Sequence, residues 1–373
     1  DKIKATGYHY STIGAITDAT AHYRILDMPI VEFTIVASGV GYKTSKKVVT
    51  TSKNITIELN FELEEDVLNL EEFIVTADRN ATKRSESPVV VNSISNVTFK
   101  KTQSINVAEG INFTPGIRTE TNCQNCGFTQ IRMNGLDGSY SQILINSKPV
   151  FSGLAGVYGL EMIPSNMIER LEVVKGGGSS LFGGNAIAGT VNVITKEPVN
   201  NSFVVDFRSG IIGLNNKGGS NSLDYQININ TSLITDDRKT GGYLYASTRN
   251  RNPYDSNNDG FSEIVKLKNT IFGFNFFHKP TSKNIITIDG YRISEFRRGG
   301  NKMELLPHEA DITEQLKHEI IASTISYNHF LRNNKDKLSL FGSIQYVDRD
   351  SYYGAMQDPN AYGVTKNLTS SVG

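Results

Sequence analysis

Residues 173–198 read VVKGGGSSLFGGNAIAGTVNVITKEP, a glycine-rich turn followed by an alternating apolar run. Neither common phosphate-binding pattern fits this stretch. A P-loop requires GxxxxGKS or GxxxxGKT, and no Lys–Ser or Lys–Thr pair follows these glycines. A dinucleotide fingerprint requires a helix after the glycines, whereas TVNVITKEP alternates as a strand does. We therefore expect Gly176–Gly178 and Gly183–Gly184 to let the backbone turn and pass close to neighbours.

The chain around this stretch, residues 85–198, has the pattern of one compact α/β unit. SINVAEGINFTPGI (104–117) predicts a short helix that ends near Pro115–Gly116. TQIRMNG and SQILINSKPV predict two strands around the turn GLDGS. IPSNMIERLEVVKG (163–176) predicts a helical turn that runs into a strand. Helix and strand signals thus alternate within one unit of ordinary domain size.

From Ser202 onward the pattern changes to alternating segments of about 10–16 residues, joined by turns rich in Asn, Gly, Asp and Lys. Seven such segments can be counted. Dyad alternation with aromatic residues near the strand ends is typical of outer-membrane barrels. The alternative is a soluble β-sandwich, but soluble strands average about five or six residues. Strand length therefore favours the barrel.

The N-terminal part divides into a β-rich segment and an acidic one. Residues 1–60 alternate apolar and polar residues between Gly, Pro and Ser, which predicts a small β-sandwich. Residues 54–78 then carry eight carboxylates and no Lys or Arg, a composition typical of extended, mobile chain. Within this tract EEFIVTA (71–77) is an apolar island. It is either an ordinary strand or a peptide that adds as a strand to a partner's sheet edge.

Composition excludes several classes of function. Lys plus Arg and Asp plus Glu both total 38, and no basic stripe interleaved with aromatics suggests a nucleic-acid partner. No stretch approaches the 18 or more apolar residues of a membrane-spanning helix. The chain opens at Asp1 without a charged-then-apolar leader, so we expect any export signal to have been removed. The six histidines are scattered and none lies in HExxH, so no enzyme is predicted.

The two cysteines, Cys123 and Cys126, form a single CxxC. One such pair supplies too few ligands for a structural zinc site. Outside the cytoplasm the alternatives are a short disulfide loop between them or two thiols near a surface.

At these motifs the sequence resembles the TonB-dependent outer-membrane receptors. IERLEVVKGGGSSLFGGNAIAGTVNVITKEP is similar to the end of their plug domain, and IRMNGLDGSYSQILINSKPV is similar to an earlier plug motif. EEFIVTA stands where the family has its TonB box. Residues 1–60, with GVGYKTSKKVV, resemble the carboxypeptidase-regulatory-like domain of Bacteroidetes-type receptors.

The resemblance implies a mainly β fold, with a transmembrane antiparallel β-barrel around an α/β plug and a small N-terminal β-sandwich. The implied boundaries are a partial β-sandwich at 1–60, an acidic linker with the TonB box at 61–84, the plug at 85–198 and the first barrel strands at 199–373. Seven strands cannot close a barrel of about 22, so the chain is expected to hold an incomplete barrel.

The same resemblance implies partners. TonB, in the inner membrane, would bind the box residues, which are Glu71, Glu72, Phe73, Ile74, Val75, Thr76 and Ala77. Outer-membrane lipid would surround the barrel, and a surface lipoprotein is a further candidate partner. Plug-to-barrel ion pairs are expected at Glu169, Glu172, Lys175 and Arg132.

Two plug segments match substrate-facing apices of the family, NCQNCGFTQ (122–130) and FSGLAGVYGLE (151–161). The implied substrate contacts are Cys123, Gln124, Asn125, Cys126 and Tyr158. The alternative is a disulfide-pinned turn without ligand contact. No cofactor is required, but Asp255, Asn257 and Asp259 in DSNNDGFSE (255–263) occupy calcium-loop positions. Lys266 stands where an EF-hand needs its Glu, so a non-EF calcium site and a solvated Asx turn remain the alternatives.

The expected function is import of a scarce large nutrient, such as cobalamin, haem or an iron complex, driven by proton-motive force. The rival classes are a surface binding or adhesion module and a signalling receptor, each with a plug-like recognition domain and no transport.

Overall fold

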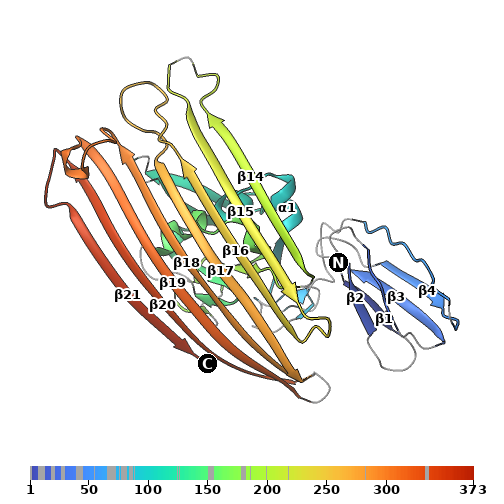
Figure 1. Ribbon diagram of the computed structural model, residues 1–373. Coiled ribbons are helices and arrows are strands. Elements are labelled where there is room, and N and C mark those ends of the chain that lie inside the picture. Colours follow the sequence, from blue (N-terminus) through green and yellow to red (C-terminus); the bar gives the residue numbers. More distant parts are fainter. Residues whose placement is uncertain are drawn as a thin grey trace.

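A computed structural model of the chain describes residues 2–6, 13–17, 22–26, 30–38, 45–53, 55–64, 73–74, 76, 82–83, 87, 89–123, 125, 127–149, 155–177, 182–184, 186–198, 200–216, 218–281, 283–331 and 336–373. In Figure 1 the described strands form a small sheet near the N-terminus, a compact α/β unit, and a long sheet that curves around that unit. We call the α/β unit the plug and the long sheet the wall.

The N-terminal sheet is antiparallel with strand order β2-β1-β3-β4. Its strands are β1 (Lys2–Thr6), β2 (Ile13–Ile16), β3 (Glu32–Ser38) and β4 (Ser45–Thr50). Phe33 and Ile35 of β3 form its core, and Leu59 and Phe61 from the extended segment 55–64 pack on them. Within the described residues, the N-terminal domain is therefore a single four-stranded sheet covered by extended chain. The sequence had predicted a small β-sandwich.

The plug contains a five-stranded sheet with order β11-β10-β13-β12-β7, in which only the β10–β13 pair is parallel. The strands are β7 (Val91–Ser95), β10 (Ser141–Ile145), β11 (Lys148–Pro149), β12 (Ile168–Lys175) and β13 (Gly189–Thr195). A separate hairpin joins β8 (Ile117–Cys123) and β9 (Phe128–Met133). The helical elements are α1 (Asn96–Lys101), α2 (Val107–Ile111), α3 (Ala155–Met162) and the 3-10 turns η2 (Gly138–Tyr140) and η3 (Ser165–Met167).

The helix predicted within 104–117 is α2, and it begins where its capping residues place it. The side chain of Asn106 accepts a hydrogen bond from the Glu109 N–H at 2.9 Å. The Glu109 carboxylate accepts one in return from the Ile105 N–H at 3.0 Å. Two donors at the helix start are thus satisfied by side chains, which stabilises a helix of only five residues.

The wall has eight strands, each antiparallel to the next in chain order. They are β14 (Ser202–Ile212), β15 (Ser222–Ile234), β16 (Thr240–Arg251), β17 (Lys266–Thr281), β18 (Asn284–Gly300), β19 (Ile312–Leu331), β20 (Asp336–Ala355) and β21 (Tyr362–Val372), with the turn η4 (Pro307–Glu309) before β19. The sequence predicted seven of these and missed β21. The longest, β19 and β20, have 20 residues each, which exceeds the predicted length.

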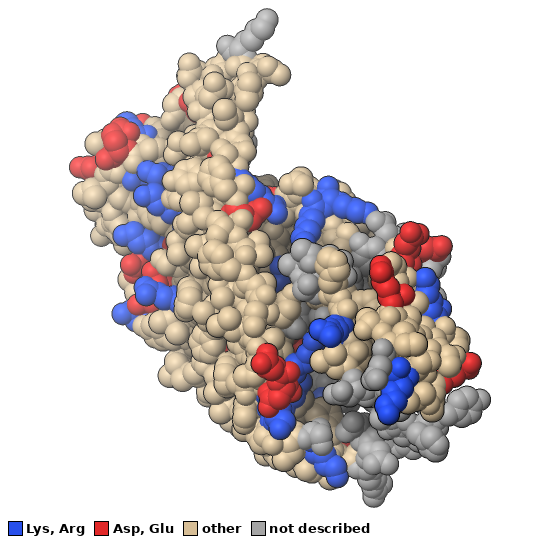
Figure 2. All heavy atoms as spheres, turned by 45° about the vertical axis from the view of Figure 1, so that its right-hand side comes forward, with Lys and Arg blue, Asp and Glu red and all other residues tan. Residues whose placement is uncertain are grey.

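The two faces of the wall differ in polarity, as β15 shows. Leu223, Ile229 and Leu233 are exposed on the outer face, whereas Gln226 and Asn228 are buried on the face toward the plug. Successive side chains of a strand point to opposite faces, so alternation of apolar and polar residues in the sequence gives an apolar outer face and a polar inner face. Figure 2 shows a broad surface with few charged side chains, which gather along its borders. Among the described residues, no helix is long and apolar enough to cross a membrane.

Two roles were expected of the glycine-rich stretch, and the structure shows the turns but not the close approach to neighbours. Gly176, Gly177 and Gly183 have φ values of +78°, +42° and +97°, so they make turns that other residues adopt at a cost. An added Cβ there would meet nothing within 4 Å, so the expected close approach is wrong for these three. It occurs instead at Gly189, where a Cβ would lie 2.2 Å from the Val174 carbonyl oxygen. Strands β12 and β13 can pair there only because the residue is glycine.

Candidate functional site at the plug and wall interface

The loop between β8 and β9 carries the CxxC segment and lies against the wall. The Cys123 thiol is 3.4 Å from Glu314 Oε1 of β19, and the Gly127 carbonyl accepts a 2.6 Å bond from Arg297 of β18. An added Cβ on Gly299 would lie 2.2 Å from the Asn125 carbonyl oxygen, so the backbones nearly touch. This predicted apex is therefore joined to β18 and β19 by several close contacts.

The other predicted substrate contacts are placed only in part. Tyr158 belongs to helix α3, but its side chain is outside the described residues, as are Gln124 and Cys126. Both the substrate apex and the Cys123–Cys126 disulfide therefore stay predictions.

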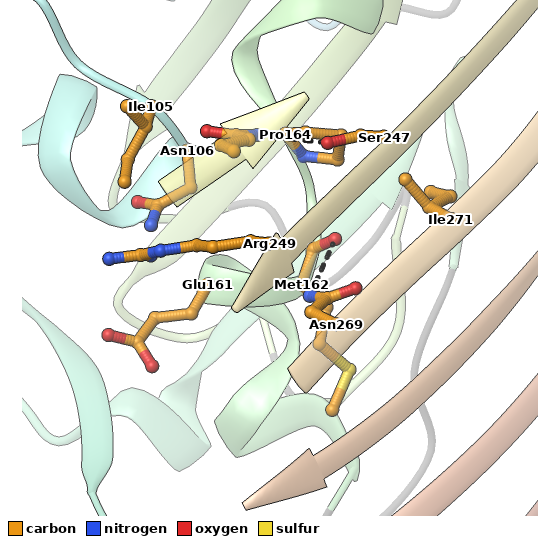
Figure 3. Close-up of a pocket in the computed structure, with 10 residues that line it drawn as sticks. Ile105, Asn106, Glu161, Met162, Pro164, Ser247, Arg249, Asn269 and Ile271 are labelled. Atoms are coloured by element: carbon orange, nitrogen blue, oxygen red, sulfur yellow. Dashed lines mark hydrogen bonds between the residues drawn. The ribbon is translucent and has the colours of Figure 1, made fainter. Parts of the chain in front are cut away.

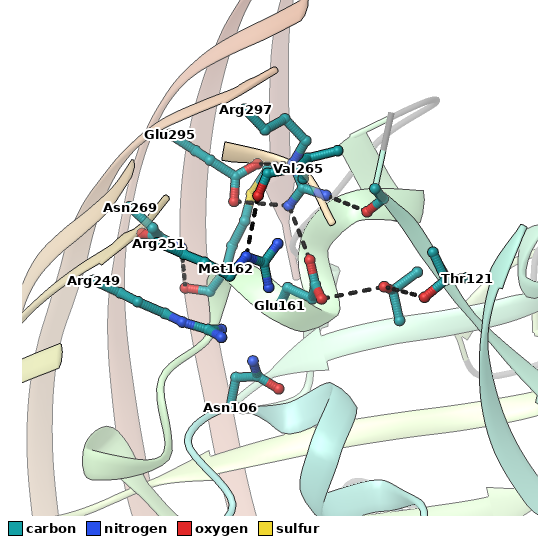
Figure 4. A network of polar contacts seen from close by, with 12 residues as sticks. Asn106, Thr121, Glu161, Met162, Arg249, Arg251, Val265, Asn269, Glu295 and Arg297 are labelled. Carbon is teal, nitrogen blue, oxygen red and sulfur yellow. Dashed lines mark hydrogen bonds and ion pairs between the residues drawn. The ribbon is translucent and has the colours of Figure 1, made fainter. Parts of the chain in front are cut away.

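A buried ionic network connects helix α3 to the wall (Figure 4). Arg297 pairs with Glu295 on its own strand, with an Nε–Oε1 distance of 2.8 Å, and with Glu161 of α3 at 3.2 Å. The side chains of Arg297 and Glu295 are 1% and 0% exposed. Glu161 also accepts a bond from the Thr129 hydroxyl at 3.2 Å. A buried guanidinium therefore joins a plug carboxylate to a wall carboxylate, which orients α3 against β18.

A second group of polar contacts surrounds a small cavity between plug and wall (Figure 3). Arg249 of β16 makes a bidentate pair with Asp224 of β15, at 3.0 and 2.6 Å. Burial raises the pKa of the nearby Glu109 carboxyl, against the opposing effects of the Ile105 N–H and Arg249. The cavity is lined by Ile105, Asn106, Glu161, Met162, Pro164, Gln226, Ser247, Arg249, Asn269 and Ile271. Six of these ten residues are polar or charged, so this part of the interface mixes polar and apolar side chains.

Uncharged contacts complete the interface at η3. The Asn166 side chain donates to Asn230 of β15 at 3.0 Å and to the Ala246 carbonyl of β16 at 3.1 Å. Tyr243 returns a bond from its hydroxyl to the Asn166 carbonyl at 3.2 Å. Each of these hydrogen bonds replaces hydrogen bonds to water, so its net contribution to the free energy of the interface is small. Such contacts position the plug but do not hold it strongly.

The predicted TonB box is docked on the plug at one residue. Thr76 is fully buried and makes two bonds to Oε2 of Glu172 in β12, from its N–H at 2.9 Å and its hydroxyl at 2.5 Å. Asn192 of β13 donates to the same hydroxyl at 2.9 Å. Phe73 and Ile74 form β5 (Phe73–Ile74), which pairs with β6 (Thr82–Lys83). Glu71, Glu72, Val75 and Ala77 lie outside the described residues.

The plug-to-barrel ion pairs predicted from the sequence are wrong for three residues. Arg132 pairs with Glu120 and Asp137, both in the plug. Lys175 donates to the Pro115 carbonyl at 2.7 Å, and Glu172 pairs with Arg170. Glu172 and Lys175 lie on β12, which has a plug strand on either side, and Arg132 lies on the β8–β9 hairpin, so all these partners belong to the plug.

Glu161 and Arg297, which make the observed pair across the interface, were not singled out from the sequence. The only available signal was GLE within the predicted apex 151–161, which does not identify a partner 136 positions away.

The acidic loop after β16 brings three carboxylates together. Oxygen atoms of Asp255, Asp259 and Glu263 lie within 4.8 Å of one another. Asp255 accepts the Asn257 N–H at 3.3 Å, the bond that defines an Asx turn, and also accepts the N–H groups of Asn258 at 2.6 Å and Gly260 at 2.8 Å. Asn257 instead donates its side-chain amide to Asp259 at 3.0 Å. Glu263, absent from the predicted set, is the third carboxylate of this cluster, and the role predicted for Asn257 stays a prediction.

Comparison with known proteins agrees with this architecture. Residues 83–190 match the TonB-dependent Receptor Plug Domain family, and residues 7–75 match the CarboxypepD_reg-like domain family. The chain is 30% identical to a vitamin B12 transporter of Vibrio vulnificus over 122 residues, 33% of this chain and 20% of the relative. It is 27% identical to that of Vibrio cholerae over 156 residues, 42% of this chain and 24% of the relative. The chain thus spans only about a quarter of these curated relatives or less.

Solved structures share the fold. The ferric enterobactin receptor of Pseudomonas aeruginosa has a TM-score of 0.55 at 17% identity, over 76% of this chain and 46% of that one. The siderophore receptor PiuA of Acinetobacter baumannii has a TM-score of 0.52 at 14% identity, over 82% and 56%. At such identities the likeness concerns the fold alone.

Fold and interface together define a plug domain held against the inner face of a transmembrane β-sheet. Residues 83–190 belong to the family of TonB-dependent receptor plug domains, and the chain is located in the bacterial outer membrane. The predicted fold class is thereby confirmed. The match of the N-terminal domain extends to residue 75, beyond the predicted end at 60 and into the TonB box.

Proposed function

We propose that this chain is part of an importer that carries a scarce large nutrient across the outer membrane with energy supplied through TonB. One observation carries the proposal above all. The plug is joined to a two-faced wall by a buried polar interface that includes Glu161 and Arg297, and the predicted coupling segment is docked on that same plug at Thr76. Contacts of this kind can separate and re-form because water can replace each partner.

The proposed cargo is a cobalamin-like or haem-like metal complex, and other iron complexes are included. The support is the similarity to vitamin B12 transporters over the plug and the first strands of the wall. The relatives and fold neighbours are named as transporters and receptors, so we propose transport and no enzymatic reaction.

Deletion of residues 71–77 from the full-length receptor tests the proposal in its native host. Growth on limiting cobalamin or haem should be abolished, while binding of the same compound to isolated outer membranes should be unchanged. A matched control is replacement of the exposed turn residues 236–239 by a Gly/Ser linker of equal length, which should leave growth intact. Growth that survives the deletion would favour a surface binding or adhesion module instead.

The acidic loop is proposed as a calcium site of this receptor. Asp255, Asp259 and Glu263 supply hard oxygen donors, the ligand type that calcium prefers. Backbone N–H groups already bond to Asp255 and Asp259, so a bound ion would use their remaining lone pairs. Calcium titration of the purified receptor, followed by its melting temperature, should show a rise that Asp259→Asn reduces. An unchanged melting temperature in the wild type would assign the loop to Asx turns.

A further inference from the structure

The outer face of the wall carries an uncharged band that ends at a definite level. On β19, Ile320 is fully buried and Ile321 is exposed, so the odd-numbered side chains face outward. Within residues 321–331 these outward side chains include no Asp, Glu, Lys or Arg. At about 3.3 Å per residue and a strand tilt of about 40°, this stretch spans about 25 Å of the membrane, the height of the apolar band in transmembrane β-barrels. The lipid head groups therefore begin just beyond Ile321.

The connections between strands show which leaflet this level faces. Strands β17 and β18 are joined by two residues, whereas β18 and β19 are joined by residues 301–311. Since such barrels have short periplasmic turns and longer extracellular loops, the end of the band at Ile321 faces the outer leaflet. Tyr346, the register partner of Ile321, agrees with this level, because its hydroxyl donates to Asp348 at 3.4 Å while its ring lies in the band.

Charged side chains gather at this level on five neighbouring strands, β17 to β21. We call them the outer patch, which consists of Lys268, Arg292, Lys317, Glu319, Asp348, Asp350 and Lys366. Glu319, Asp348 and Lys366 are register partners on β19, β20 and β21. Lys268 is in register with Asn250 of β16, and the same row is uncharged through β15 and β14. The outer patch is thus confined to one part of the wall.

Two cations of the outer patch are paired with carboxylates. Arg292 donates to Glu319 Oε2 from Nε at 3.2 Å and from Nη2 at 3.0 Å. The Lys366 ammonium lies 3.5 Å from Asp348 Oδ2. All four side chains are at least 31% exposed, so each pair by itself contributes little to stability.

The other two cations, Lys268 and Lys317, are left with free donors. Both are exposed, and among the described residues neither has an ion-pair partner. They lie on β17 and β19 in register with Phe296 on the strand between them, so their backbones are about 10 Å apart. Two ammonium groups without a protein anion therefore stand side by side at the depth of the head groups.

From this placement we propose that the outer patch binds the phosphate groups of outer-leaflet lipid, and that Lys268 and Lys317 are the residues that contact them. Phosphate is the anion that lipid head groups present at this depth, and a lysine near an anionic membrane surface gains about fivefold in binding. The paired residues Arg292 and Glu319 would keep the neighbouring surface polar at little cost, since charges near the interface are tolerated. The inference rests on the location in the outer membrane and not on transport or cargo.

The first test measures lipid binding by native mass spectrometry. The full-length receptor is placed in phosphatidylcholine nanodiscs that contain a small fraction of lipid A with two phosphate groups. The double variant Lys268→Gln/Lys317→Gln should bind this lipid about 25-fold more weakly than wild type, about fivefold for each lysine. The matched control Lys239→Gln/Lys283→Gln removes two exposed lysines at the opposite end of the wall and should bind as wild type does. Equal binding by the two double variants overturns the inference.

The second test identifies what the lysines recognise. Lys268→Arg/Lys317→Arg keeps both charges and should retain the lipid, whereas dephosphorylated lipid A should bind wild type as weakly as the Gln variant binds the phosphorylated form. Equal binding of the two forms of lipid A to wild type would overturn the role of phosphate. Complete competition by millimolar inorganic phosphate would assign the patch to the free anion instead of lipid.

Lysine-directed cross-linking of intact outer membranes tests the remaining occupant. A product that joins Lys268 or Lys317 to another protein would assign the outer patch to a protein partner and overturn the inference.

Discussion

The plug sheet and the wall are both β-structures, but the plug buries its apolar side chains whereas the wall exposes them on its outer face. Strand β10 of the plug is buried at every position, and β12 buries Leu171 and Val173 fully. Strand β15 of the wall alternates between exposed apolar and buried polar residues. The plug therefore has an apolar core of its own, whereas the wall places its apolar side chains outward, where lipid is the solvent. The same residue types thus stabilise two sheets by facing different surroundings.

The difference predicts the largest effect for a charge placed inside the plug. Leu171→Asp puts a carboxylate without a built-in partner at a fully buried site and should destabilise the plug by about 4 kcal/mol or more. Limited proteolysis of outer membranes should then cleave residues 91–195 while the wall stays membrane-bound. Leu171→Met is the volume-conserving control and should remain resistant. Protease resistance of Leu171→Asp would show that the plug does not fold around its own core.

A charge on the outer face of the wall should have the next largest effect. Ile229→Arg replaces an exposed apolar side chain on β15, and a cation there should cost about 2–4 kcal/mol if the residue lies near the membrane midplane. Urea titration of the full-length receptor in lipid vesicles measures the change. Ile229→Val, the control, should change stability little. An equal midpoint for Ile229→Arg would contradict lipid contact at this face.

Loss of the contact between the two regions should have a smaller effect. Glu161→Gln removes the charge that Arg297 meets from the plug, yet Arg297 keeps Glu295, so the expected loss is about 1–2 kcal/mol. Faster deuterium exchange in α3 would report it. The control Glu319→Gln breaks the exposed pair with Arg292, which should leave α3 unchanged. If both variants behave alike, the Glu161 pair does not hold the plug to the wall.

The smallest effect is expected from acid at the loop that joins β18 and β19. Lys302 and Asn301 bond Asp311 at 2.7 and 2.8 Å and hold the pKa of its carboxyl below the usual 3.8. A lowered folded pKa stabilises the loop above the unfolded value, and this contribution is lost as the pH falls through the folded value. Exchange in residues 301–311 should therefore rise at low pH in wild type and depend less on pH in Asp311→Asn. An identical pH dependence in both would exclude Asp311 as the cause.

Local pattern was enough to predict seven of the eight described wall strands, because alternation repeats over 11 to 20 residues in each of them. It also located α2, whose capping residues Asn106 and Glu109 are three positions apart. It was less informative about side-chain partners. Arg132 and Lys175 were expected to reach the barrel but bond within the plug, and Glu161 was not expected to meet Arg297. Lys175 and Pro115 lie 60 positions apart, and Glu161 and Arg297 lie 136 positions apart, so no local spacing encodes these pairs.

The sequence by itself determined the two-faced wall, the glycine turns and the class of protein, since each depends on periodicity or on motifs of a few residues. Tertiary structure alone decided where Thr76 of the predicted TonB box lies. An acidic tract predicts extended chain, but burial of Thr76 against Glu172 and Asn192 depends on a cross-strand pair that exists only once β12 and β13 are aligned. The sequence around Thr76 therefore carries no information about the buried carboxylate that it contacts, because that carboxylate comes from a distant part of the chain.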